Sequence, residues 1–189
     1  MARFTKAELQ AFRGVEVPDL VGPGLRLLFV GINPGLWTAA VQTHFAHPGN
    51  RFYPALLRAG IIESPINPSD GMSDSDRAGF VAHGLGITNL VRRASARADE
   101  LSVEELRAGA VRLVSFVEQH HPAVVAIAGI TAYRSAFGVR AAGAGRRPEP
   151  LAGAEVWVVP NPSGLNAHET IPSLATAYAA AARAAGVIG

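Results

Sequence analysis

The sequence predicts an α/β fold, a single-domain three-layer α/β/α sandwich with a mostly parallel central sheet. Short and almost wholly apolar runs alternate along the chain with segments of helical spacing. Such runs are typical of strands buried on both faces, and their alternation with helices is typical of parallel sheets. The linkers are too short to separate domains, so residues 1–189 are expected to form one domain.

The first half of the chain contains two expected strands. A short amphipathic helix at 5–12 precedes the strand 25–33, which Gly and Pro residues bound. A long polar loop is expected through 37–50, and then a helix at 51–61 with Pro54 in its first turn. Ser75 or Asp76 is expected to cap a short helix, and the apolar run 86–91 is the second strand.

The second half begins with the clearest helix, 102–120, where Ser102 and Glu105 have the spacing of a capping box. Its apolar face comprises Leu106, Ala110, Val111, Leu113, Val114 and Val117. Strands are expected at 123–129 and 155–161, with a short helix at 131–138 and a flexible basic loop at 141–153 between them. An alanine-rich helix is expected at 168–185.

Composition limits the chemistry of the protein. Hydrophobic residues make up 49% of the 189 residues and charged residues 17%, as in a compact globule. Cysteine is absent, which excludes disulfides, Cys-ligated zinc, iron–sulfur clusters and a thiol nucleophile. No apolar run is long enough to cross a bilayer, and the first residues lack a signal-peptide core, so a cytoplasmic protein is expected. The net charge of +2 is weak evidence for a nucleic-acid partner.

Two of the expected strands end in an Asn-Pro step. The first is followed by GINPG, residues 31–35, and the last by NPSGLN, residues 161–166. Ligands of parallel sheets bind beyond the carboxyl ends of the strands, so the two loops are expected to lie side by side in a site. A third Asn-Pro, at 67–68, follows no strand and is interpreted as an ordinary turn.

Neither loop contains Asp or Glu, so neither supplies a carboxylate base. The amide of Asn33 can orient a water molecule, which suits a reaction with a good leaving group and a cation-like transition state. Cleavage of the N-glycosidic bond to uracil is such a reaction. Leu165, near the tip of the second loop, either packs back into the core or projects as a wedge for a DNA base stack.

GINPG, HFAHPGNRF and NPSGLN, in this order, resemble motifs of the mismatch-specific uracil/thymine DNA glycosylase family of the uracil-DNA glycosylase superfamily. The resemblance spans about residues 25–182. It implies a monofunctional DNA glycosylase of base excision repair, a hydrolase that flips uracil out of mismatched duplex DNA, preferably from G·U pairs, and leaves an abasic site. It also implies a double-stranded DNA substrate, neither metal nor cofactor, a monomer, and a location with the nucleoid in the cytoplasm.

The resemblance assigns roles to individual residues. Asn33 positions the attacking water, and the backbone around Ile32 binds the base. Phe45 stacks on the flipped base, and Thr38 lies beside its C5 edge, which predicts that uracil is preferred to thymine. Asn161 lies in the base pocket. The segment that fills the vacated stack and contacts the orphaned guanine comprises Gly164, Leu165 and Asn166.

Four arginines are candidate phosphate contacts: Arg92 and Arg93 after the second strand, and Arg146 and Arg147 in the basic loop. Solvated surface charge is the alternative for each of them. Some relatives carry a lysine where this chain has Asn89, so the role of that lysine does not transfer. The sole lysine, Lys6, lies in the expected N-terminal helix, which predicts a monofunctional enzyme.

Two other interpretations stay open. The chain could be a weakly catalytic or non-catalytic protein that binds lesions or abasic sites. It could instead be a small-molecule nucleotide-binding protein, although it lacks a GxGxxG after its first strand and a P-loop. The sequence does not rank uracil, thymine, ethenocytosine and hypoxanthine as substrates.

Overall fold

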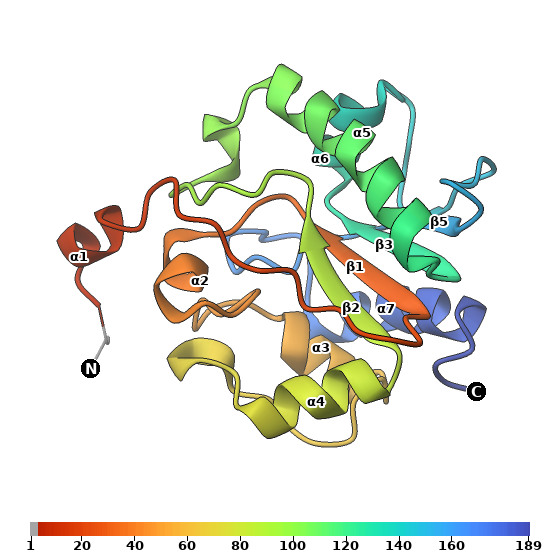
Figure 1. The fold of residues 1–189 in the computed structure, drawn as a ribbon, viewed down its shortest axis with the longest axis horizontal. Helices are drawn as coiled ribbons and strands as arrows, with labels where there is room; N and C mark the ends of the chain where they lie inside the picture. Colours follow the sequence, from red (N-terminus) through yellow and green to blue (C-terminus); the bar gives the residue numbers. More distant parts are fainter. Residues whose placement is uncertain (1–3) are drawn as a thin grey trace.

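The computed structural model describes residues 4–189, which form a five-stranded sheet in the order β2–β1–β3–β5–β4 (Figure 1). Four strands are parallel: β1 (Leu27–Gly31), β2 (Leu85–Asn89), β3 (Val124–Ala128) and β5 (Glu155–Val159). The short β4 (Gly145–Arg146) pairs antiparallel with β5. The predicted mostly parallel sheet is confirmed, and its four expected strands lie within two residues of their predicted bounds.

Helices cover both faces of the sheet (Figure 1). On one face, α3 (Phe52–Arg58), α4 (Asp74–Ala82) and α7 (Ile171–Ala184) pack over Leu27 and Phe29 of β1. On the other face, α5 (Val103–His120) and α6 (Ile130–Phe137) pack over Leu28 and Val30. Because successive strand residues point to opposite faces, one apolar strand supplies both cores. The three-layer α/β/α prediction is confirmed.

The capping box of α5 forms as predicted, with Glu105 N donating to Ser102 Oγ and Ser102 N donating to the Glu105 carboxylate. The predicted apolar face is wrong at Val111, which is 71% exposed. The buried face includes Gly109 instead. This residue must be glycine, because an added Cβ there would lie 2.2 Å from the carbonyl oxygen of Leu90. The helix can therefore approach the backbone that follows β2 closely.

Three segments differ from the predictions. The expected loop at 37–50 begins with a helix, α2 (Leu36–Val41), which is too short for its periodicity to be recognised and is fixed by burial of Leu36 and Trp37. Helix α4 is capped by Ser73, which accepts a hydrogen bond from Asp76 N, so neither Ser75 nor Asp76 is the cap. The expected flexible loop at 141–153 contains β4, which is held by pairing with β5.

The remaining elements lie outside the two cores. They are α1 (Lys6–Gln10) and the 3-10 turns η1 (Pro68–Asp70) and η2 (Ala98–Glu100). Asn67 caps η1, in line with the turn expected there. Among the described residues, no helix is both long and apolar enough to span a bilayer.

The sheet order changes one expectation about the site. β3 lies between β1 and β5, so the loops after β1 and β5 do not follow adjacent strands. The start of α6, which follows β3, lies between them: Gly129 N donates to Val159 O, and an added Cβ at Gly129 would lie 3.1 Å from Ile32 Cδ1. Three strand ends therefore form the floor of the candidate site.

Candidate active site

The Asn33 amide is anchored on one side only. Its Nδ2 donates to Pro34 O at 3.0 Å, to Arg93 O at 3.3 Å and to Ser95 Oγ at 2.8 Å. Since two of these partners are carbonyl oxygens, the orientation of the amide is determined. Within residues 4–189, Oδ1 of Asn33 accepts no hydrogen bond, and it is not among the fully buried unpaired atoms. A fixed acceptor is thus presented to the solvent.

Ser95 holds this amide in place, and sequence reasoning did not identify it. Its Oγ is buried, donates to Arg97 O at 2.6 Å and therefore accepts from Asn33. Its backbone N also donates to Pro34 O at 3.1 Å, and Val91 N donates to Ile32 O at 2.9 Å. The segment that follows β2 consequently supports the first loop. A serine a few residues beyond a strand has no sequence signature that would have revealed this role.

Phe45 combines an unusual backbone conformation with a stacked ring. It adopts a left-handed backbone conformation, with φ 54°, which is uncommon for a non-glycine residue and frequent at functional sites. Its ring stacks on Phe52, with centroids 4.1 Å apart and planes at 25°. Its ring edge also lies 3.3 Å from the position that a Cβ on Gly31 would occupy. The half-buried ring therefore lies at the carboxyl end of β1.

Thr38 supports the loop that carries Phe45. The side chain is buried on α2, and its Oγ1 accepts a hydrogen bond from Ala46 N at 3.3 Å. Its carbonyl oxygen accepts from Thr43 N at 3.2 Å, and Tyr53 Oη donates to His44 O at 3.1 Å. Burial raises the pKa of Tyr53 well above its usual value, so this phenol stays a donor. The conformation of residues 43–46 is therefore fixed from two sides.

His44 and Asn89 form a polar pair beside Phe45 that the sequence did not predict. His44 Nε2 lies 2.9 Å from Pro18 O, a pure acceptor, so the proton is on Nε2. Burial lowers the pKa of His44, which keeps the ring neutral and leaves Nδ1 to accept from Asn89 Nδ2 at 3.2 Å. Asn89 Oδ1 then faces Gly31, 2.4 Å from where a Cβ would be placed. Only glycine fits at position 31.

The second loop is folded by its own polar side chains. Asn161 Oδ1 accepts from Ser163 N at 3.0 Å, and Asn166 Nδ2 donates to Asn161 O at 3.1 Å. Asn166 N donates to Ser163 O at 3.0 Å, which closes a four-residue turn. Leu165 lies in this turn and is 89% exposed. Of the two sequence-based alternatives, the projecting leucine is therefore the one observed.

Arg51, at the start of α3, joins the second loop to the segment around Phe45. Its backbone N donates to Pro162 O at 3.0 Å, and its guanidinium donates to Ser163 O, Asn166 O and Glu169 O. Gly164 packs so closely on Gly49 that an added Cβ would lie 2.6 Å from Gly49 O. The structure thus joins two segments that are more than 100 residues apart.

The arginines after β2 are engaged by carboxylates. Arg92 lies 3.1 Å from Glu16 and 3.6 Å from Asp19, and Arg93 forms a two-pronged pair with Glu105 at 2.6 and 3.0 Å. The Arg93 hydrogen bonds lower the pKa of Glu105 to about 2. These cations are not free surface charges, so a phosphate would compete with carboxylates for them.

The arginines of the basic segment lie away from the site. Arg146 forms a 3.0 Å pair with Glu155, and Arg147 lies over the Tyr133 ring at 5.9 Å. Both flank the middle of β5, at Trp157 and Val156, and not its carboxyl end. A phosphate contact from either therefore needs DNA to extend along the β4 edge of the sheet.

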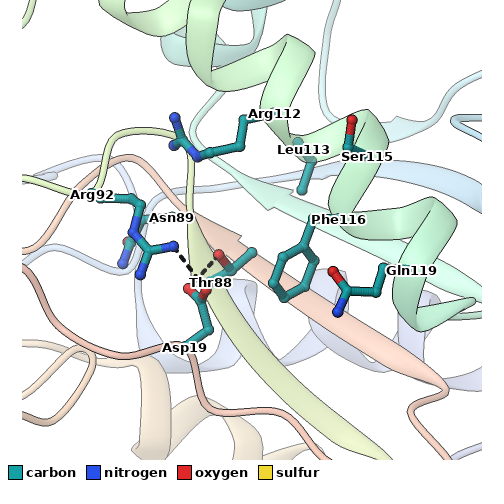
Figure 2. A pocket seen from close by; sticks show the side chains of 9 residues that line it. All are labelled: Asp19, Thr88, Asn89, Arg92, Arg112, Leu113, Ser115, Phe116 and Gln119. Carbon is teal, nitrogen blue, oxygen red and sulfur yellow. Dashed lines mark hydrogen bonds and ion pairs between the residues drawn. The ribbon is translucent and has the colours of Figure 1, made fainter.

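A cavity of about 160 Å³ lies between the edge strand β2 and α5 (Figure 2). Its lining includes Thr88, Arg92 and Phe116, and Thr88 Oγ1 donates to Asp19, another lining residue, at 2.6 Å. Asn33, Phe45 and Asn161 do not line it but Asn89 does, so this cavity adjoins the strand-end site at that residue. Among the described residues, no group of three or more His, Asp or Glu side chains could hold a metal ion.

The fold and the strand-end site define an α/β protein whose polar amides and one aromatic ring meet at the carboxyl ends of parallel strands. Residues 18–182 match the family model of the uracil DNA glycosylase superfamily, and the chain belongs to this superfamily. Its members are DNA glycosylases, which are hydrolases acting on DNA.

A solved structure shares the fold. It is the solution NMR structure of a Methanosarcina acetivorans protein with the provisional description of uracil DNA glycosylase. The TM-score is 0.62 at 16% identity, and the match covers 90% of this chain and 98% of the other.

Proposed function

We propose that this protein is a monofunctional DNA glycosylase that excises uracil from mismatched duplex DNA, with G·U as its preferred pair, and leaves an abasic site. Its strongest support is the Asn33 amide, whose Nδ2 is held by three acceptors while Oδ1 stays open. A single chain contains every residue proposed for the site, so a monomer suffices.

The chemistry follows from what the site contains. Asn33 Oδ1 accepts a hydrogen bond from a water and orients it toward the anomeric carbon of a flipped nucleotide. An amide does not take up a proton at neutral pH, so it contributes by positioning. The uracil anion leaves with the bonding electrons of the glycosidic bond, and the proton lost by the attacking water passes to the solvent or to the released uracil. Lys6, the sole lysine, lies on α1, far in sequence from the strand-end motifs, so no Schiff base with the sugar is proposed.

The base is proposed to lie against Phe45 and the polar groups around Gly31. Base–aromatic stacking contributes about 1–3 kcal/mol, and Phe45 is already oriented by its stack on Phe52. Asn89 Oδ1, turned toward Gly31 by neutral His44, offers an acceptor to an N–H donor such as N3–H of uracil. Asn161 and the backbone near Ile32 complete the pocket, and Thr38 disfavours the C5 methyl group of thymine.

The second loop is proposed to enter the duplex. Leu165 projects into solvent and would fill the space that the flipped base leaves. The Asn166 side chain is used to fold the loop, so contacts from this segment to the orphaned guanine are proposed for the backbone near Gly164 and Asn166. Four arginines remain candidate phosphate contacts: Arg92, Arg93, Arg146 and Arg147. Each would have to give up its present partner in order to bind a phosphate.

Single-turnover assays test the proposal. Duplexes that carry one uracil, thymine, ethenocytosine or hypoxanthine opposite guanine or adenine are incubated with excess protein, and base release is measured. Uracil opposite guanine should be released fastest, and Asn33→Ala should slow that release by about 100-fold to 1,000-fold, in the range of losing one oriented transition-state group. Equal release by wild type and Asn33→Ala would refute the enzyme and favour the alternative, a lesion-binding protein without catalysis.

A further inference from the structure

The tip of the second loop is held by one side chain from another part of the chain. Residues 163–166 form the turn that presents Leu165, and Asn166 N donates to Ser163 O across it. A single guanidinium nitrogen of Arg51 donates to the carbonyl oxygens at both ends of this turn, Ser163 and Asn166, the latter at 2.8 Å. Its other terminal nitrogen donates to Glu169 O.

Placing the Arg51 guanidinium among carbonyl oxygens costs free energy, and the order that it gives to the loop is what this cost supports. Within the described chain Arg51 forms no salt bridge, and its Nε is buried without a partner. Arg51 as a whole is half-buried, and withdrawing part of a cation from water with only carbonyl partners opposes folding, a penalty that a fully exposed position would avoid. The base of the loop does not need Arg51, because Tyr178 Oη donates to Pro160 O at 3.1 Å. What the guanidinium adds is order at 163–169.

We propose that Arg51 is a positioning residue that sets Leu165 for insertion into the duplex. The inference rests on the proposed glycosylase function. Gly164 allows the loop to pack closely on the segment around Phe45, because its backbone lies directly against Gly49 O. Without Arg51 the turn samples other conformations, and the entropy of ordering it again must be supplied when DNA is bound. Base flipping from a duplex is then impaired, whereas the base pocket is intact.

The test compares paired and unpaired uracil. Arg51→Met removes all the loop contacts of the guanidinium but keeps an aliphatic stem, and it should lower single-turnover excision from G·U duplex by about tenfold to hundredfold. Excision from single-stranded uracil DNA should fall by less than about threefold, because no stack has to be opened. Arg58→Met, which removes an exposed arginine from the same helix, is the control and should change neither rate.

Two further measurements separate a loop clamp from a general structural role. In a Leu165→Ala background, Arg51→Met should cause no additional loss on duplex, because Arg51 acts through Leu165. In an Asn33→Ala background, fluorescence of a 2-aminopurine beside the uracil reports flipping without excision, and Arg51→Met should abolish its rise. Equal losses on both DNAs, or additive losses with Leu165→Ala, would overturn the proposal.

Failure of the proposed function would be recognised separately. If wild type released no uracil, amide hydrogen exchange of residues 163–169 would still test the clamp, and exchange should be faster in Arg51→Met than in wild type. Unchanged exchange there would show that Arg51 does not order the turn. Should Arg51→Met not fold, Arg51→Lys is used, since one ammonium cannot span all three carbonyls and an intermediate loss is expected.

Discussion

Ser95→Ala tests whether the Asn33 amide acts by being held still. The substitution removes a buried hydroxyl that accepts from Asn33 Nδ2 at 2.8 Å and donates to Arg97 O at 2.6 Å. Asn33 itself is unchanged, and its Nδ2 keeps Pro34 O at 3.0 Å and Arg93 O at 3.3 Å. The amide therefore loses the shortest of its three anchors and gains freedom to rotate.

The expected magnitudes separate stability from catalysis. Two hydrogen bonds are lost and no amide proton is left without an acceptor, so the free energy of unfolding should fall by about 1–2 kcal/mol. For a chain of this length that corresponds to a fall in Tm of about 3–6 °C. The excision rate should fall by about tenfold to hundredfold, as expected when a water-orienting group is displaced by a fraction of an ångström to 1 Å.

The assay is single-turnover excision from G·U duplex at saturating protein, combined with thermal unfolding of each variant. Thr88→Val is the matched control, since it also removes a buried hydroxyl on the β2 side of the sheet, one that donates to Asp19 at 2.6 Å. It should reduce Tm by at least as much as Ser95→Ala and leave the excision rate within about twofold, because Thr88 faces the opposite side of β2 from Asn89.

Two results would refute the positioning role of Ser95. One is a lower Tm for Ser95→Ala with an unchanged rate, which would mean that the remaining two anchors suffice. The other is a further loss of rate when Ser95→Ala is added to Asn33→Ala, since a residue that acts only through Asn33 has no effect once Asn33 is absent.

Three other predictions concern the wedge, the base pocket and pH. Leu165→Ala should reduce excision from duplex by about tenfold or more but spare single-stranded substrate, and equal losses would exclude a wedge. Thr38→Ala should raise G·T relative to G·U excision, whereas Thr38→Ser, which keeps the hydroxyl bonded to Ala46 N, should raise it less. Because the folded pKa of His44 lies below its usual value near 6.5, the unfolded chain binds the proton first as the pH falls. The Tm of the wild type should therefore decrease as the pH falls below about 6.5, and His44→Gln should make this decrease smaller. Identical profiles of Tm against pH for the two proteins would show that His44 is not the group responsible.

The fold was largely predictable because its strands are short, apolar and bounded by Gly and Pro. The start of α5 was predictable because Ser102 and Glu105 have the spacing of a capping box, which needs only local hydrogen bonds. The elements that were missed depend on tertiary contacts. Six residues of α2 are stabilised by the burial of Leu36 and Trp37, and β4 exists only through its pairing with β5. Local sequence contains no comparable signal for them.

The candidate site was predictable where a motif marks its residues, and it was hidden where a supporting residue comes from far away in the sequence. Asn33, Phe45 and Leu165 stand in short strand-end motifs, and the structure places them at the carboxyl edge of the sheet or at an exposed turn. Ser95 and Arg51 act on residues 62 and 112 positions away, respectively. Such supporting residues are determined by how the chain folds back on itself.

The stacked pair of Phe45 and Phe52 has a consequence for how the proposed base pocket can change. Phe52 lies 5.0 Å edge-on from Phe29 and 5.9 Å from Tyr178, ring centre to ring centre, so a column of rings runs from the sheet to the pocket surface. A base placed on Phe45 would extend that column by one more ring. Substrate preference and core packing then share the same atoms, and a new preference at this surface requires the interior behind it to repack as well.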